Sequence, residues 1–327
     1  MKKIIFTFLL TFLLASCTVD RDNTEVSKKT DSSLEVTTTL VPLGSIAKFI
    51  WWEHVEVNTI IEPGFSPHTF DLKPSHIKKL LEADLIYSTW LEIDNFILKW
   101  NYENLIELKS YVTLLEWHEH NHEEHEGHEG HEEHEDHEDH EGHEDHEGHE
   151  EHEDEIFYDA HIWLSLENWN KIAQVMRDNF IALDNENKVT YENNYLSFVE
   201  ESNKIKSEFL LENQNKKISH FVIFHDAYNY LFNEFWIDPD YAIVLEDTAG
   251  REPSVTDMKE NLDIIALNNI KYLYKEPQFD SKLITMLQEQ QYNLEVDILD
   301  PLGQWVDKNS YFDNIKQNLN NLKKIYE

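Results

Sequence analysis

Glu35-Val-Thr-Thr-Thr-Leu-Val41 is rich in β-branched residues, and a helix-like stretch at residues 44–50 and a second β-rich stretch at residues 54–61 follow it directly. Further along, Leu85-Ile-Tyr-Ser-Thr89 has the same β-rich character, and the helical segment before it has Ser75 as a candidate N-cap. Short β-rich runs that alternate with helical segments are typical of α/β units with parallel sheets. The sequence therefore predicts an α/β fold.

The second half of the chain repeats this alternation. Its expected elements are helices at 165–183, 187–213 and 226–235, strands at 218–224, 241–245, 271–274 and 294–299, and a helix with Ser254 as N-cap. A length of 327 residues favours two domains. We expect an N-terminal α/β lobe at 34–185, a linking helix at 186–215 and a C-terminal α/β lobe at 216–327.

The N-terminus has the features of an export signal. Met1-Lys2-Lys3 precedes an apolar run that is too short to span a membrane, which predicts a signal peptide at residues 1–16. Leu14-Ala15-Ser16-Cys17 resembles a bacterial lipobox, in which Cys17 would receive the lipid, although an incidental cysteine after an ordinary signal is the alternative. Polar residues 17–33 suit a flexible tether. We expect an exported protein, lipid-anchored at the bacterial cell envelope, in the periplasm or on the outer face of the cell membrane.

Composition limits the classes of function. Lys and Arg number 27 against 65 Asp and Glu, for a net charge of −38, which argues against nucleic-acid binding and favours cations as partners. A single cysteine excludes an intramolecular disulfide and a Cys-rich zinc module.

Residues 117–155 form a low-complexity segment with 13 histidines, 20 acidic residues and no Lys or Arg. Almost nothing in it is apolar, so we expect a disordered loop inserted in the N-terminal lobe. A solvated spacer is one interpretation. Because imidazole is a common ligand of zinc, nickel and copper, a weak multi-site metal collector is the preferred one. Its histidines are His118, His120, His122, His125, His128, His131, His134, His137, His140, His143, His146, His149 and His152.

Three other histidines and one aspartate follow predicted strands: His68, His161, His225 and Asp300. The carboxyl ends of strands meet at one edge of an α/β sheet, so residues distant in sequence can converge there. Three imidazoles and one carboxylate form a tetrahedral set that suits Zn²⁺. For each residue the alternative is a helix cap or a hydrogen-bonded surface group. We assign no role to His54, His76 and His220.

Four segments carry a family resemblance: Gly64-Phe-Ser-Pro-His-Thr-Phe-Asp-Leu-Lys-Pro-Ser75, Asp159-Ala-His-Ile-Trp-Leu-Ser165, Phe224-His-Asp-Ala-Tyr228 and Leu299-Asp-Pro-Leu-Gly303. They resemble the ligand loops of the metal-binding solute-binding lipoproteins that serve bacterial ABC importers, in particular the zinc-specific group of cluster A-I. The resemblance implies two α/β lobes joined by a long rigid helix, with the ion buried between them. It also implies metal ligation by His68, His161, His225 and Asp300, and a monomer that partners an ABC permease and its cytoplasmic ATPase.

The resemblance also bears on the metal. Manganese-binding relatives typically have Glu where this chain has His225, and an acidic, histidine-rich insertion is typical of the zinc group, so zinc is favoured over manganese. Two alternatives remain: a manganese- or iron-binding member of the family, and a surface zinc-buffering or adhesion-associated lipoprotein that acts through its loop. A zinc hydrolase is disfavoured because the chain has no HExxH helix. We expect a protein that is not an enzyme.

Glycine is scarce and tryptophan abundant. The chain has eight glycines, four of them in the histidine-rich segment, and nine tryptophans, whereas average usage gives about 23 glycines. Several tryptophans stand where a helix end or turn favours glycine: Trp51, Trp52, Trp90, Trp117, Trp236 and Trp305. One hypothesis is that the source organism translates UGA as glycine, so that some of these residues are glycine in the native protein. The alternative is a lineage that tolerates surface aromatics.

Overall fold

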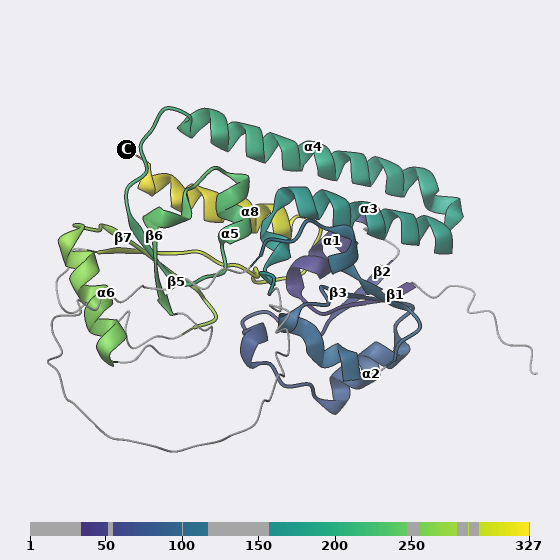
Figure 1. Ribbon diagram of the computed structural model, residues 1–327. Helices are drawn as coiled ribbons and strands as arrows, with labels where there is room; N and C mark the ends of the chain where they lie inside the picture. The colour runs from purple at the N-terminus through teal and green to yellow at the C-terminus, as the bar shows by residue number, and fades with distance from the viewer. Residues whose placement is uncertain are drawn as a thin grey trace, which may run out of the picture. The chain divides into compact units, whose positions relative to one another are not determined.

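Two parallel four-stranded sheets are the framework of the computed structural model, which describes residues 34–51, 55–99, 101–116, 157–246, 255–279, 287 and 294–326 (Figure 1). The first sheet has the order β2 (Val55–Thr59), β1 (Leu34–Thr38), β3 (Leu85–Ser88), β4 (Leu105–Glu107). The second has the order β6 (Ala242–Glu246), β5 (Phe221–His225), β7 (Tyr272–Lys275), β8 (Glu295–Ile298). The predicted α/β class is confirmed. Strand β4 was not predicted.

Both sheets have a point at which the strand order reverses. In the first sheet Val36 of β1 pairs with Val57 of β2 on one side and Leu85 of β3 on the other, and β5 pairs in the same way with β6 and β7. Strands β3 and β5 are buried at every residue, as expected of central strands covered on both faces. Ligands of open α/β sheets bind beyond the carboxyl ends of the strands at such reversals.

Seven helices of the described residues pack around the sheets: α1 (Val41–Trp51), α2 (Pro74–Glu82), α3 (Leu166–Leu183), α4 (Lys188–Asn213), α5 (Asn229–Glu234), α6 (Val255–Leu267) and α8 (Ser310–Leu322). Helix α1 begins earlier than predicted, because Pro42 is compatible with a first helical turn. Helix α8 was not predicted. No helix of the described part combines the length and apolar character that a membrane crossing requires.

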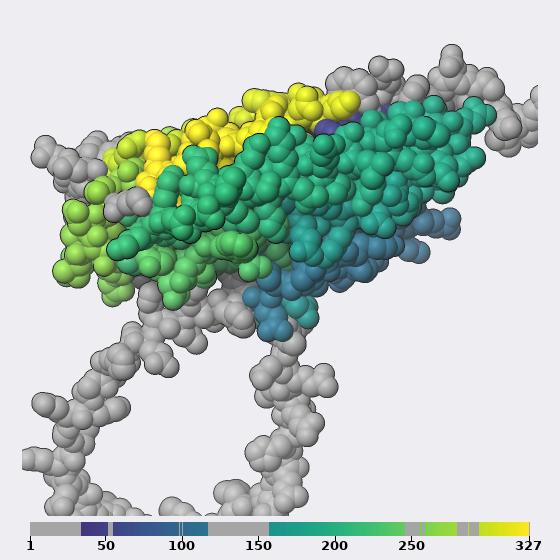
Figure 2. Space-filling model, turned by 90° about the horizontal axis from the view of Figure 1, so that it is seen from above, coloured from purple at the N-terminus to yellow at the C-terminus, as the bar shows by residue number. Residues whose placement is uncertain are grey.

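Helix α4, a single helix of 26 residues, lies across helices that flank the two sheets, among them α1, α3 and α8 (Figures 1 and 2). Towards its start, Phe198 packs against Phe49 of α1, with ring centroids 5.1 Å apart. Towards its end, Phe209 packs against Phe235, directly after α5, at 5.1 Å. The expected long helix is therefore present, and aromatic contacts hold both of its halves against neighbouring elements.

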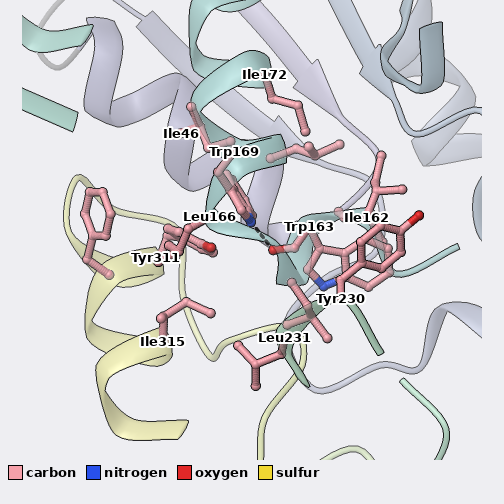
Figure 3. Packing of buried hydrophobic residues seen from close by; sticks show 14 of the residues in the cluster. Ile46, Ile162, Trp163, Leu166, Trp169, Ile172, Tyr230, Leu231, Tyr311 and Ile315 are labelled. Atoms are coloured by element: carbon pink, nitrogen blue, oxygen red, sulfur yellow. Dashed lines mark hydrogen bonds between the residues drawn. The ribbon is translucent and has the colours of Figure 1, made fainter. Parts of the chain in front are cut away.

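The apolar core is continuous between the two sheets. One cluster of buried residues includes side chains of β1, β5 and α8. Figure 3 shows its centre, where Trp169 packs on Tyr311 with ring centroids 3.7 Å apart and donates its indole N–H to the carbonyl of Trp163. The indole of Trp163 in turn donates to the carbonyl of Pro301 at 2.7 Å.

Two of the suspect tryptophans have a left-handed backbone. The φ angles of Trp90 and Trp236 are 59° and 57°, a conformation that costs residues other than glycine about 1–2 kcal/mol. For Trp51 the expectation is wrong, because it is the last residue of α1 and its buried ring packs against Phe180 at 4.4 Å. Trp305 does not have a positive φ either. Trp52 and Trp117 lie outside the described residues.

Several predictions concern residues that lie outside the part of the chain described by the structure. These are the signal peptide, the tether, Cys17, Ser254 and the histidines of residues 117–155. Ser75 does not cap its helix, because α2 begins at Pro74 with Lys73 at the N-cap position. The cap contact comes from His76, whose Nδ1 accepts the backbone N–H of Lys73 at 3.1 Å.

Candidate metal centre

Three of the predicted ligands meet in space. His68 lies in a short 3₁₀ helix, η1 (Pro67–Thr69), in the connection after β2, His161 directly precedes η4 (Ile162–Leu164), and His225 is the last residue of β5. One ring nitrogen of each lies within 4.8 Å of those of the other two. The ring centroids are 5.4 to 5.5 Å apart. Elements belonging to both sheets therefore bring the three imidazoles together.

A cavity of about 10 Å³ lies at the three rings. A cavity of about that size holds a single water molecule, so the space suits one ion. Its other lining residues come from both halves of the chain: Ser66, Pro67, Ile93, Trp163, Glu276, Gln278, Phe279, Pro301 and Leu302.

A buried carboxylate orients His161. Oδ1 of Asp159 lies 2.8 Å from Nδ1 of His161 and also accepts its backbone N–H at 2.8 Å. The other ring nitrogen, Nε2, is buried and has no hydrogen-bond partner among the described residues. A buried polar atom of this kind is costly unless something binds it, and the lone pair of a neutral imidazole nitrogen is a metal ligand.

A second buried carboxylate faces His225. Oε1 of Glu276 lies 2.6 Å from Nδ1 of His225, and the side chains of the two residues are almost inaccessible to solvent. Tyr228 donates its hydroxyl to the carbonyl of Leu299 at 2.9 Å and to Oε1 of Glu276 at 3.3 Å. Burial, followed by the negative charge of Glu276, raises the pKa of Tyr228 well above its ordinary value, so this hydroxyl stays protonated.

His68 keeps part of its surface exposed, yet its ring is poorly solvated. Burial, and then the proximity of His161 and of His225, lowers its pKa from 6.5 to about 3. The ring is therefore neutral at physiological pH. A neutral imidazole is the form that binds a metal ion.

Asp300 is held apart from this group. It lies two residues after β8, and it does not belong to the cluster of ligand atoms found among the described residues. Its Oδ1 accepts the backbone N–H groups of Leu302 and Gly303 at 3.0 Å and the amide of Gln278 at 2.8 Å, and its Oδ2 accepts the amide of Gln304 at 2.9 Å. Gly303 has a φ of 83°, so the turn favours glycine at this position.

Two buried acidic residues beside the histidines were not predicted from the sequence. Asp159 lies in the segment Asp159–Ser165, for which only His161 was predicted as a ligand, and Glu276 lies outside the four segments. Glu276 directly follows β7, the strand next to β5 at the reversal of the second sheet. The same rule that selected His225 and Asp300, a polar residue at the carboxyl end of a strand, could have found it.

Comparison with known proteins identifies the family. A family model described as "Zinc-uptake complex component A periplasmic" matches residues 36–325, so the chain belongs to this family. The zinc-binding lipoprotein AdcA of Streptococcus pneumoniae is 26% identical over 339 residues, which cover 99% of this chain and 61% of that lipoprotein. The high-affinity zinc uptake system protein ZnuA of Yersinia pestis is 28% identical over 298 residues, covering 88% of this chain and 89% of that protein. The chain thus spans about three fifths of the length of the pneumococcal relative.

Structural comparison shows the same fold. A crystal structure of ZnuA superposes with a TM-score of 0.69 at 21% identity, covering 90% of this chain and 99% of that one. Residues 1–18 match the prokaryotic membrane lipoprotein lipid attachment site. The chain is therefore an exported, lipid-anchored protein of the cell envelope. The family is described as a component of an uptake complex, which agrees with the expectation of a protein that is not an enzyme.

Proposed function

We propose that this chain is an extracytoplasmic solute-binding protein that captures Zn²⁺ with His68, His161 and His225 and delivers it to an ABC importer. Its partners are a membrane permease and the cytoplasmic ATPase of that permease. The observation that carries the proposal is the convergence of three imidazoles on a cavity the size of one ion. Membership of the zinc-uptake family supports the same conclusion.

Donor chemistry favours zinc as the cargo. Zn²⁺ prefers four ligands, and imidazole nitrogen suits it better than it suits Mn²⁺, which favours oxygen. We assign Asp300 as the fourth ligand, because it is buried beside the cavity-lining residues Pro301 and Leu302.

The proposed division of the chain into two lobes follows the two sheets. We assign residues 34–185 to an N-terminal lobe, 186–215 to the linking helix and 216–327 to a C-terminal lobe. His68 and His161 then belong to one lobe and His225 and Asp300 to the other. The thirteen histidines of residues 117–155 are proposed as a weak collector, because imidazole binds zinc and they recur along an acidic, low-complexity sequence. Deleting this segment should lower zinc stoichiometry and preserve the tightest site.

Zinc titration of the full chain, with metal content measured in parallel, tests the proposal. His161→Ala should abolish the tightest site and leave the weak sites in place. His220→Ala is the matched control, because it removes an imidazole that does not line the cavity. Tight binding that survives His161→Ala would place the site elsewhere. In cells, permease-dependent zinc uptake should fail with His161→Ala and persist with His220→Ala.

Metal preference provides a separate test. His225→Glu replaces a borderline nitrogen by a hard, negatively charged oxygen, so the relative affinity for Mn²⁺ over Zn²⁺ should rise. Competition between the two metals for the tight site measures the ratio. An unchanged ratio would remove His225 from the ligands.

A further inference from the structure

Two of the three imidazoles at the cavity have a buried carboxylate at the ring nitrogen Nδ1. On one side of the cavity Asp159 contacts His161 at 2.8 Å, and on the other Glu276 contacts His225 at 2.6 Å. The exposed fractions of the two acidic residues are 1% and 2%. Asp159 also accepts the side-chain amide of Asn229 at 3.3 Å, and Glu276 accepts the hydroxyl of Tyr228. Each half of the chain therefore supplies one histidine–carboxylate pair.

These distances define the position of a ring proton. A carboxylate oxygen and an unprotonated ring nitrogen both present lone pairs, so the 2.8 Å hydrogen bond between Asp159 and His161 requires a proton between them. The 2.6 Å approach of Glu276 to Nδ1 of His225 favours the same arrangement. A neutral imidazole with its proton on Nδ1 has its only remaining lone pair on Nε2. Nε2 of His161 is buried and unpartnered within the described residues, as this arrangement requires.

The charge of a bound zinc ion also points to Asp159 and Glu276. A zinc ion held by three neutral rings and the carboxylate of Asp300 keeps a net positive charge, which the low dielectric leaves poorly compensated. The carboxylate of Asp300 is already engaged by backbone and side-chain N–H donors. Asp159 and Glu276 together carry two negative charges, which reach the ion through the polarised imidazoles.

On the basis of the proposed zinc site, we propose that Asp159 and Glu276 are its paired positioning residues. They hold His161 and His225 in the tautomer that presents Nε2 to the ion, and they balance its charge without touching it. Glu276 is the more informative of the two, because it belongs to none of the ligand segments and its removal breaks no backbone hydrogen bond among those described.

The first experiment measures affinity in the full chain. Zinc is competed with a chelator strong enough to keep the weak sites empty. Glu276→Gln preserves size and a hydrogen-bond acceptor but removes the charge, so affinity at the tight site should fall about 10–100-fold. Glu295→Gln is the matched control, because this carboxylate is exposed and pairs with Lys324. Unchanged affinity in a Glu276→Gln protein with wild-type melting temperature in the metal-free state would overturn the proposal.

The second experiment needs no acidic variant and so does not depend on how Glu276→Gln folds. In zinc-loaded wild-type protein labelled with ¹⁵N-histidine, NMR should show Nδ1 protonated and Nε2 bound to metal in both rings. The signals are assigned with the variants His161→Ala and His225→Ala. Ligation of either ring through Nδ1 would overturn the proposal while leaving the zinc site itself intact. If the wild-type chain had no tight zinc site, the proposed function would fail and this inference with it.

Discussion

At the scale of single residues, the contacts of each ring determine what it can do. His161 and His76 are both buried, but Nδ1 of His76 accepts a backbone N–H at the start of a helix, whereas Nδ1 of His161 faces a carboxylate. His76 therefore caps a helix. His161 is left with a free lone pair on Nε2. Of these two rings, the ring of His161 is therefore the one suited to bind metal.

Acid stability of the metal-free chain should depend on His68. Its pKa is about 3 in the folded protein against 6.5 for an ordinary histidine, so between these values the unfolded chain binds a proton that the folded chain does not. The contribution of the neutral His68 ring to the free energy of unfolding is fully present above about pH 6.5 and is lost progressively as the pH falls towards 3. Between about pH 7.5 and about pH 5, the unfolding free energy of His68→Gln should fall by about 1 kcal/mol less than that of the wild type. The expected difference is kept small because the ring is partly exposed. Urea unfolding at the two pH values measures it, with His220→Gln as the control. An equal loss in wild type and His68→Gln would contradict the prediction.

Trp236→Gly should stabilise the protein. The residue has a φ of 57° and an exposed fraction of 74%, so glycine relieves the backbone and sacrifices little burial. The expected gain in unfolding free energy is about 1–2 kcal/mol by denaturant titration. Trp305→Gly is the matched control: Trp305 is also exposed but lacks a positive φ, so no gain is expected. Equal effects of the two substitutions would count against backbone strain at Trp236.

The same two left-handed tryptophans support the hypothesis that UGA encodes glycine in the source organism. If it holds, peptide mass spectrometry of the native protein should find glycine at positions 90 and 236, and the coding DNA should have UGA there. UGG codons at Trp90 and Trp236 would contradict it. Trp51 is a weaker candidate, because its buried ring packs against Phe180 and Tyr191.

At the scale of elements, the start of α3 fixes the segment that carries His161. Ser165 caps α3 by accepting the backbone N–H of Asn168 at 3.2 Å, and its hydroxyl donates to Glu234 of α5 at 2.9 Å. Glu234 also binds Lys206 of α4. One buried carboxylate thus ties three helices together close to the metal centre.

Glu234→Ala should loosen this junction. It leaves the buried hydroxyl of Ser165 without its acceptor and Lys206 without its partner, so the unfolding free energy should fall by about 1–3 kcal/mol. Zinc affinity should fall as well, because the segment before α3 is less well ordered. Glu201→Ala is the control: it breaks a more exposed pair with Lys316, and should cost less than about 1 kcal/mol. Chemical denaturation compares the two variants, and equal losses would show that the junction contributes no more than a surface pair.

At the scale of the whole described molecule, the two halves have different kinds of contact. Behind the site a continuous apolar core joins them, with Trp163 and Trp169 at its centre (Figure 3). At the site itself, three imidazoles and the carboxylate of Glu276 line a cavity large enough for one ion. We expect an ion bound there to join the two halves at the front of an interface that is already packed at the back.

Zinc should therefore raise the melting temperature, and Asp300 should contribute to the rise. Binding to the native state alone adds about 4 kcal/mol at a thousandfold excess over Kd. The comparison uses protein without residues 117–155, so that the weak sites do not contribute. Asp300→Asn is preferable to Asp300→Ala, because an amide oxygen can still accept the backbone N–H groups of Leu302 and Gly303. Its thermal shift with zinc should be markedly smaller than that of the parent, and an equal shift would exclude Asp300 from the site.

The sequence by itself was sufficient for the α/β class, most of the strands, the long helix and the three histidines that the fold brings together. Hydrophobic periodicity is a local property, and the run from Glu35 onward shows it without reference to the rest of the chain. The four histidine- and aspartate-bearing segments were recognisable because each is contiguous. Two left-handed tryptophans were predictable for the same reason, since a helix end or turn is also local.

Only the tertiary structure decided which of these residues meet. Strand order determined that Glu276 stands beside His225, because β5 and β7 are neighbours in the sheet although they are far apart in the chain. Packing determined that Trp51 is a buried helix residue. Hydrogen bonding determined that Asp300 is held by its own turn, apart from the three rings. Proximity, burial and ring tautomer all arise from contacts between distant segments, and no local pattern specifies them.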